Sequence, residues 1–115
     1  EGEYGLIPVA ATQPGQKLAA FSNFGGWIDL AAPGDQITSA LPGGAYGTWG
    51  GTSMAAPMVA GAAALLRAKE PALDPIKVVR RLERRSVALC GGAKQAQLDA
   101  AALMGFALQA DPVCP

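Results

Sequence analysis

The segment Gly50–Pro57 and the apolar run that follows it constrain the fold of this chain more than any other stretch. Two glycines and a Thr-Ser pair lead into Met58–Leu66, in which every residue is alanine, valine, glycine, methionine or leucine. This composition predicts a buried, Ala-rich helix that begins at Thr52 or Ser53. Pro57 is tolerable near its start, because only a first-turn carbonyl then loses its usual partner.

Ser53 is expected at the N-terminus of this helix, where free backbone N–H groups and the positive end of the helix dipole lie. This position suits a nucleophile whose reaction develops an oxyanion, and the preceding glycines let a substrate backbone come close. The same residues also suit a structural role, in which Thr52 or Ser53 caps the helix after a glycine-rich turn. Local chemistry leaves both interpretations open.

The residues Gly51–Pro57, followed by Val59-Ala60-Gly61, resemble the nucleophile segment of the subtilisin-like serine peptidases (subtilases, peptidase family S8). Further segments resemble the same family in order and spacing, and these are Ile7–Ala11, Phe21–Gly25, Leu30–Gly34, Ile37–Ser39 and Leu98–Leu103. The resemblance covers roughly residues 2–105. The sequence departs from the family at Ala10, where glycine is usual, and at Met58, where a non-catalytic histidine is common.

The resemblance implies an α/β fold: residues 1–115 would be the C-terminal part of a subtilisin-like three-layer parallel-sheet fold, a single partial domain. It implies that Ser53 is the acyl-forming serine of a Ser-His-Asp triad in an endopeptidase, with protein or peptide substrates. Gly51, Thr52 and Trp49 would border the substrate, with Trp49 on the leaving-group side of the cleft. Another interpretation of Trp49 is a loop aromatic that covers the core.

The chain contains no histidine, so it cannot complete a Ser-His-Asp triad by itself. In the family, the Asp, the His and an oxyanion-binding Asn lie upstream of this stretch. We therefore expect the isolated chain to be inactive and its partner to be the upstream segment of the same protease. Lys69 and Lys77 are the other candidate bases. A non-catalytic subtilase-like binding or scaffolding module is the alternative function.

Composition and charge bear on whether the chain binds nucleic acid, a membrane or a cofactor. Half of the 115 residues are apolar and the net charge is zero, which favours a folded domain and disfavours nucleic acid or an anionic membrane as a partner. Met54–Leu66, the longest apolar run, is too short to span a bilayer. No cofactor is expected in this chain. Full enzymes of the family often bind calcium, but Asp29 and Asp35 alone do not form a site.

Cys90 and Cys114 are the two cysteines of the chain. The family implies an extracellular, secreted protein. In that setting the pair is expected to form a disulfide, which would stabilise the fold by about 3 kcal/mol. Two unpaired thiols are the alternative.

Apolar runs and turn residues predict three short strands, Leu6–Ala11, Trp27–Ala31 and Gln36–Ala40, and a turn over Thr12–Lys17. The glycine-rich stretch Leu41–Gly51 is predicted to be mostly loop. Such strands would expose apolar faces and edges if they stood alone.

Two further helices are predicted from their capping residues. Asp74-Pro75 is a typical helix start, and Asp99 is a candidate cap for a last helix that runs to about Leu108. On the first of these helices Ile76, Val78, Val79 and Leu82 would form the buried face, and the basic residues opposite would form a solvated face.

Overall fold

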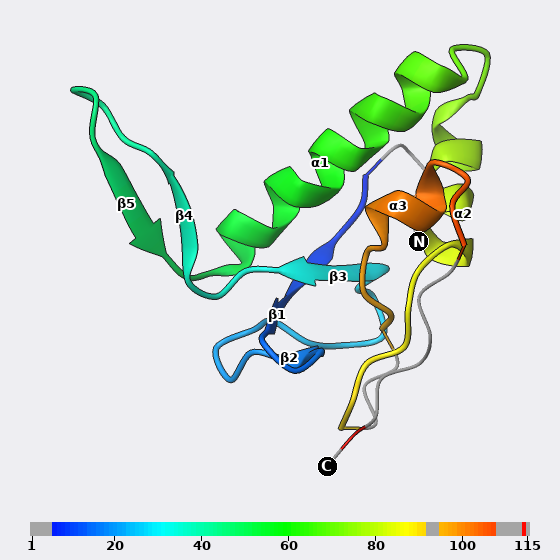
Figure 1. Ribbon diagram of the computed structural model, residues 1–115. Coiled ribbons are helices and arrows are strands. Elements are labelled where there is room, and N and C mark those ends of the chain that lie inside the picture. Colours follow the sequence, from blue (N-terminus) through cyan, green and yellow to red (C-terminus); the bar gives the residue numbers. More distant parts are fainter. Residues whose placement is uncertain (1–5, 92–94, 108–113, 115) are drawn as a thin grey trace.

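The computed structural model describes residues 6–91, 95–107 and 114 (Figure 1). These ranges form a mixed α/β fold, as predicted, in which the strands precede the helices along the chain. The order is β1 Val9–Gln13, β2 Lys17–Leu18, β3 Leu30–Pro33, β4 Ile37–Ala40, β5 Tyr46–Trp49, α1 Thr52–Lys69, α2 Pro75–Arg84 and α3 Ala100–Leu103. In Figure 1, α1 crosses the sheet that contains β1 and β3 and extends toward α2.

The three-stranded sheet has the order β2-β1-β3, with β1 and β3 parallel and β2 antiparallel to β1. Ala11 and Leu30 pack on the α1 side in the main core cluster. Ala10 and Ala31 belong to a second cluster that includes Leu89. The expectation that the strands expose apolar faces is therefore wrong for β1 and β3, because a segment far along the chain covers the second face.

The strands start later than predicted. β1 begins at Val9, after Pro8, and continues through Thr12 and Gln13, so the predicted turn over Thr12–Lys17 is wrong at these two residues. Thr12 is only 2% exposed, and its Oγ1 donates to Gln97 Oε1 at 2.7 Å. This partner is 85 residues away in sequence, so local pattern reading could not identify Thr12 as a buried strand residue.

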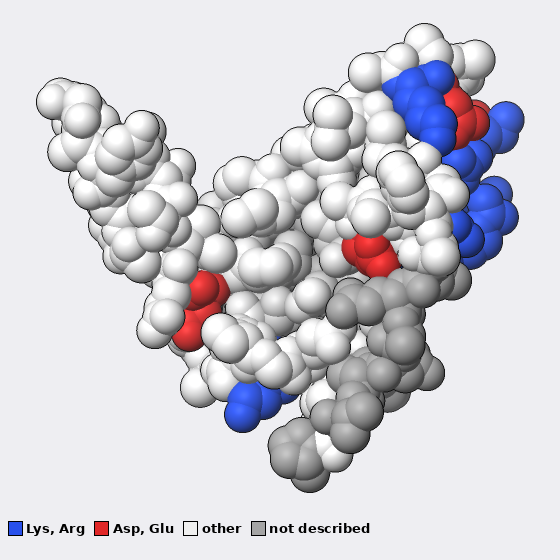
Figure 2. Space-filling view, viewed as in Figure 1, with Lys and Arg blue, Asp and Glu red and all other residues white. Residues whose placement is uncertain are grey.

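Strands β4 and β5 form a separate antiparallel hairpin, from Ile37↔Trp49 to Ala40↔Tyr46. The prediction that Leu41–Gly51 is mostly loop holds outside β5, a strand that it did not identify, and β4 does not join the parallel sheet. The hairpin projects from the molecule, and the view in Figure 2 shows it without charged residues.

Helix α1 begins at Thr52, as predicted, but Gly51 is its N-cap and no side chain caps it. The expectation of a Thr or Ser cap is wrong. Gly51 has a φ of 156°, a conformation that side-chain-bearing residues rarely adopt. The buried residues form one stripe along the helix: Ala55, Val59, Ala62 and Leu66. Much of the remaining surface is apolar and exposed, with Leu65 56% exposed.

The two capping predictions are confirmed. Asp74 Oδ1 accepts a hydrogen bond from the Lys77 amide at 2.9 Å, and Asp99 Oδ1 accepts one from Ala102 at 3.0 Å. The last helix ends at Leu103, earlier than predicted, and Leu108 lies outside the described residues. In α2, Val78, Val79 and Leu82 are buried as predicted, whereas Ile76 is 45% exposed.

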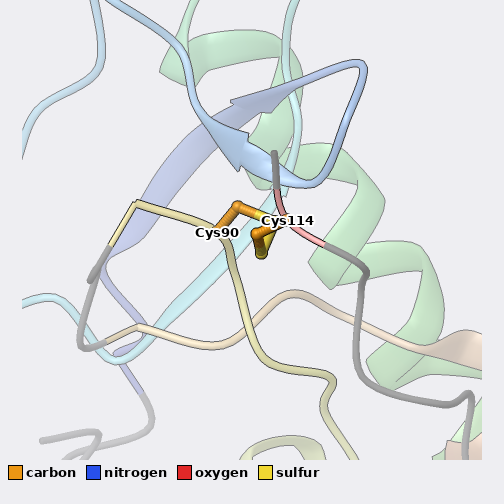
Figure 3. The surroundings of a disulfide bond; sticks show 2 residues. All are labelled: Cys90 and Cys114. Carbon is orange, nitrogen blue, oxygen red and sulfur yellow. A yellow bond between two sulfur atoms is a disulfide. The ribbon is translucent and has the colours of Figure 1, made fainter.

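Cys90 and Cys114 form the expected disulfide, with an S–S distance of 2.02 Å (Figure 3). The Cys90 amide donates to Gln16 O at 2.8 Å. The disulfide therefore joins Cys114 to a residue that is itself hydrogen-bonded to the turn between β1 and β2.

We expect the double variant Cys90→Ser/Cys114→Ser to lose about 3 kcal/mol of unfolding free energy, because the unfolded chain is then no longer closed into a loop. Urea denaturation monitored by fluorescence measures the change, with the fully reduced protein as a control that should match the variant. Alkylation of unreduced protein followed by mass spectrometry should find no modified cysteine. Two modified thiols would contradict the pairing.

Candidate active site

The start of α1 is held by a chain of backbone hydrogen bonds from the sheet. Thr12, in β1, accepts from the Gly34 amide at 3.0 Å, and Gly34 accepts from the Gly51 amide at 2.7 Å. Gly34 directly follows β3. The C-terminal ends of two parallel strands thereby fix Gly51, two residues before Ser53.

Gly34 is packed so closely that a side chain has no room. A Cβ atom at this position would lie 2.6 Å from Ala11 Cβ and 2.7 Å from Gly51 O, with Ala55 Cβ at 3.2 Å. In the sequence, Gly34 is noticeable only as part of the Pro-Gly pair that ends a strand. Its role in positioning the helix start is visible only in the folded chain.

Thr52 is positioned by the loop between β2 and β3. Asn23 Nδ2 lies 3.5 Å from Thr52 Oγ1, at the long end of the hydrogen-bond range. The loop itself is anchored by Ser22, whose Oγ accepts from the Ala11 amide at 2.9 Å and donates to Asn23 O at 2.8 Å. In the sequence, the only indication that this loop is important is the resemblance of Phe21–Gly25 to a segment of the family.

Ser53 is the second residue of α1, and its side chain is exposed. Its amide is in the first turn, where no helical carbonyl is available to it. Within the described part of the chain, the Ser53 hydroxyl makes no hydrogen bond. Ser53 thus combines a free hydroxyl with a free N–H at the positive end of a helix.

The candidate lysine bases do not reach Ser53. Lys69 ends α1 and donates to Met104 O, so it lies roughly 24 Å from Ser53, at a rise of about 1.5 Å per residue. Lys77 is in α2, with its Nζ 3.9 Å from Asp74 Oδ2. Neither lysine is therefore placed to act as a base for Ser53.

A groove of about 400 Å³ separates the hairpin from the first turns of α1. It is lined by Ile37, Thr38, Ser39, Ala40, Leu41, Gly47, Trp49, Ser53, Met54, Pro57 and Met58. Trp49 and Ser53 both line this groove. Trp49 is 58% exposed and belongs to neither core cluster, so the interpretation as a core-covering aromatic is wrong. The sequence signal for the groove is the absence of charge between Asp35 and Arg67.

Among the described residues, no group of three or more histidine, cysteine, aspartate or glutamate side chains is placed to hold a metal ion. In the same ranges, no helix combines the length and hydrophobicity needed to cross a bilayer.

Residues 2–105 match the sequence profile of the Subtilase family. Subtilisin NAT of Bacillus subtilis subsp. natto is 49% identical over 77 residues, which cover 67% of this chain and 20% of that protein. Subtilisin BL of Lederbergia lenta is 40% identical over 83 residues, covering 72% of this chain and 31% of that protein.

Solved structures agree with the sequence comparison. A protease from Pseudoalteromonas arctica PAMC 21717 superimposes with a TM-score of 0.79 at 31% identity, covering 87% of this chain and 35% of that one. A cold-adapted subtilisin-like serine proteinase superimposes with a TM-score of 0.74 at 36% identity, covering 82% and 35%. The subtilisin-like fold class predicted from the sequence is confirmed, and the chain spans 20% to 35% of the length of these four proteins.

Proposed function

Because the chain belongs to the subtilase family, we propose that it is the C-terminal portion of a serine endopeptidase domain and that Ser53 is its nucleophile. The observation that carries this proposal is the exposed Ser53 hydroxyl at the N-terminus of α1, which has no hydrogen-bond partner among the described residues and lies beside an uncharged groove. Its histidine, aspartate and oxyanion-binding asparagine would come from an upstream segment of the same protease.

The chemistry follows from this arrangement. The imidazole of the upstream histidine takes the Ser53 proton as Oγ attacks the carbonyl carbon of the scissile peptide bond. The Ser53 N–H and the upstream asparagine stabilise the oxyanion that forms. The intermediate collapses to an acyl-enzyme as the imidazolium protonates the leaving amine, and water then releases the acyl group. Gly51 and Thr52 would contact the substrate main chain, and Trp49 would border the leaving-group side.

The exposed surface of α1 supports the proposal of an upstream partner. A second cavity, of about 450 Å³, runs along this helix beside Ile7 and Val9 and includes Ala56, Ala60 and Ala63. A helix that is apolar on all sides is normally buried, yet α1 buries one stripe here. The Cys90–Cys114 disulfide supports an extracellular location, where such bonds persist.

The test is a Ser53→Ala substitution in the longest native form of the protein that contains this chain. We expect hydrolysis of casein and labelling by a fluorophosphonate to be lost, because alanine offers no nucleophile. Ser39→Ala is the matched control, since Ser39 is an exposed serine that lines the same groove. It should retain activity within a few-fold. Activity or labelling that survives Ser53→Ala contradicts the assignment of Ser53 as the nucleophile. A wild-type protein that shows neither activity nor labelling favours the binding-module alternative.

A further inference from the structure

A third cavity lies at the opposite end of α1 from Ser53. It has a volume of about 320 Å³, and four of the residues that line it are cationic: Lys69, Arg81, Arg84 and Arg85. Figure 2 shows lysine and arginine side chains gathered at this corner of the molecule, where Figure 1 places α2 and the end of α1. The proposed peptidase chemistry uses none of these residues.

The hydrogen bonds of this cluster leave most of its positive charge without a counter-charge. Lys69 Nζ donates to Met104 O. Arg85 donates from Nε to Ala102 O at 3.0 Å and from Nη2 to Phe106 O at 2.9 Å. These main-chain carbonyls orient the two cations, but they carry no formal charge. Lys69 and Arg85 therefore remain cationic centres with further N–H donors to offer.

The other two cations, Arg81 and Arg84, differ in whether a carboxylate contacts them. Arg81 Nη1 contacts Glu70 Oε2 at 2.7 Å, and this hydrogen bond lowers the pKa of the Glu70 carboxyl. Arg84 makes no hydrogen bond or ion pair with any residue in the described ranges. Among the contacts that these four cations make with described residues, Glu70 supplies the one carboxylate, so the described lining of the cavity has a surplus of positive charge.

We propose that this cavity binds a tetrahedral oxyanion of the phosphate or sulfate class. Like charges held together around a concavity repel one another, and an anion relieves that repulsion. Guanidinium groups present planar pairs of N–H donors that match the oxygens of such anions. The bound anion would connect the end of α1, α2 and the segment that follows α3. It would act far from Ser53, as a stabilising ligand.

Isothermal titration of the longest native form of the protein with inorganic phosphate, and separately with sulfate, tests this proposal. We expect saturable binding of one anion per chain. Arg84→Gln should weaken it about tenfold, the equivalent of a lost hydrogen bond to a charged group. Arg84 is exposed and makes no hydrogen bond or ion pair with a described residue, so this variant should remain folded. Lys69→Gln should weaken binding in the same direction.

Arg80→Gln is the matched control, because Arg80 is an exposed arginine of α2 that does not line the cavity. It should change the Kd less than twofold. The proposal is overturned if no saturable heat appears, or if Arg80→Gln weakens binding as much as Arg84→Gln, which indicates a diffuse charge effect. Acetate that binds as tightly as phosphate overturns the assignment to a tetrahedral oxyanion.

Discussion

Labelling of Ser53 by a fluorophosphonate should rise from background in the isolated chain to near completion when the upstream segment of the same protease is supplied. The chain has no histidine, and the lysines considered as bases lie at other places in the fold. A positioned general base contributes roughly 10²- to 10⁴-fold to such a reaction. The measurement co-refolds the two polypeptides, treats them with the probe and locates the label by mass spectrometry.

A substitution on the exposed side of α1 tests whether the upstream segment docks there, without changing the groups that react at Ser53. Ala60 lines the cavity beside Ile7 and Val9, so Ala60→Glu would bury an unpaired carboxylate if the upstream segment covers this surface. Such a charge costs about 3–5 kcal/mol, which weakens association about 100-fold or more. Ala68→Glu, on an exposed residue outside this cavity, should leave labelling unchanged. Equal labelling with and without the upstream segment, or no effect of Ala60→Glu, contradicts the docking proposal.

Gly34→Ala should destabilise the protein by about 1–3 kcal/mol, the usual cost of overpacking a closely packed site. The new methyl group would lie 2.6 Å from Ala11 Cβ and 2.7 Å from Gly51 O. Relief of this clash must move the strand end away from the start of α1. Ser53 labelling in the reconstituted enzyme should therefore fall as well. Urea denaturation measures the first effect and the labelling rate measures the second.

Gly26→Ala is the matched control, because a Cβ atom at Gly26 would meet nothing within 4 Å. We expect it to change the unfolding free energy by less than about 0.5 kcal/mol, as is usual for surface substitutions. If Gly34→Ala unfolds the protein more easily but leaves the labelling rate intact, Gly34 serves packing alone and does not position Ser53. Wild-type stability in Gly34→Ala would show that the strand end can move without cost.

The sequence by itself determined the features that depend on neighbouring residues. The helix starts after Asp74 and Asp99 were predicted because a capping carboxylate acts on an amide three residues later. The start of α1 and the place of Ser53 in its first turn followed from the glycine pair and the apolar run. These signals are local, so a short window of sequence contains both partners.

Only the tertiary structure decided how these elements meet. Thr12 is a strand residue because its backbone pairs with Pro33 of β3, and it is buried with its hydroxyl bonded to Gln97 across the fold. Gly34 must be glycine because β1 and the start of α1 converge on it. Tyr46–Trp49 is a strand because β4 is its partner, although its glycine-rich surroundings favour a loop. In each case the deciding contact joins residues that are separated along the chain, and local composition contains no information about that partner.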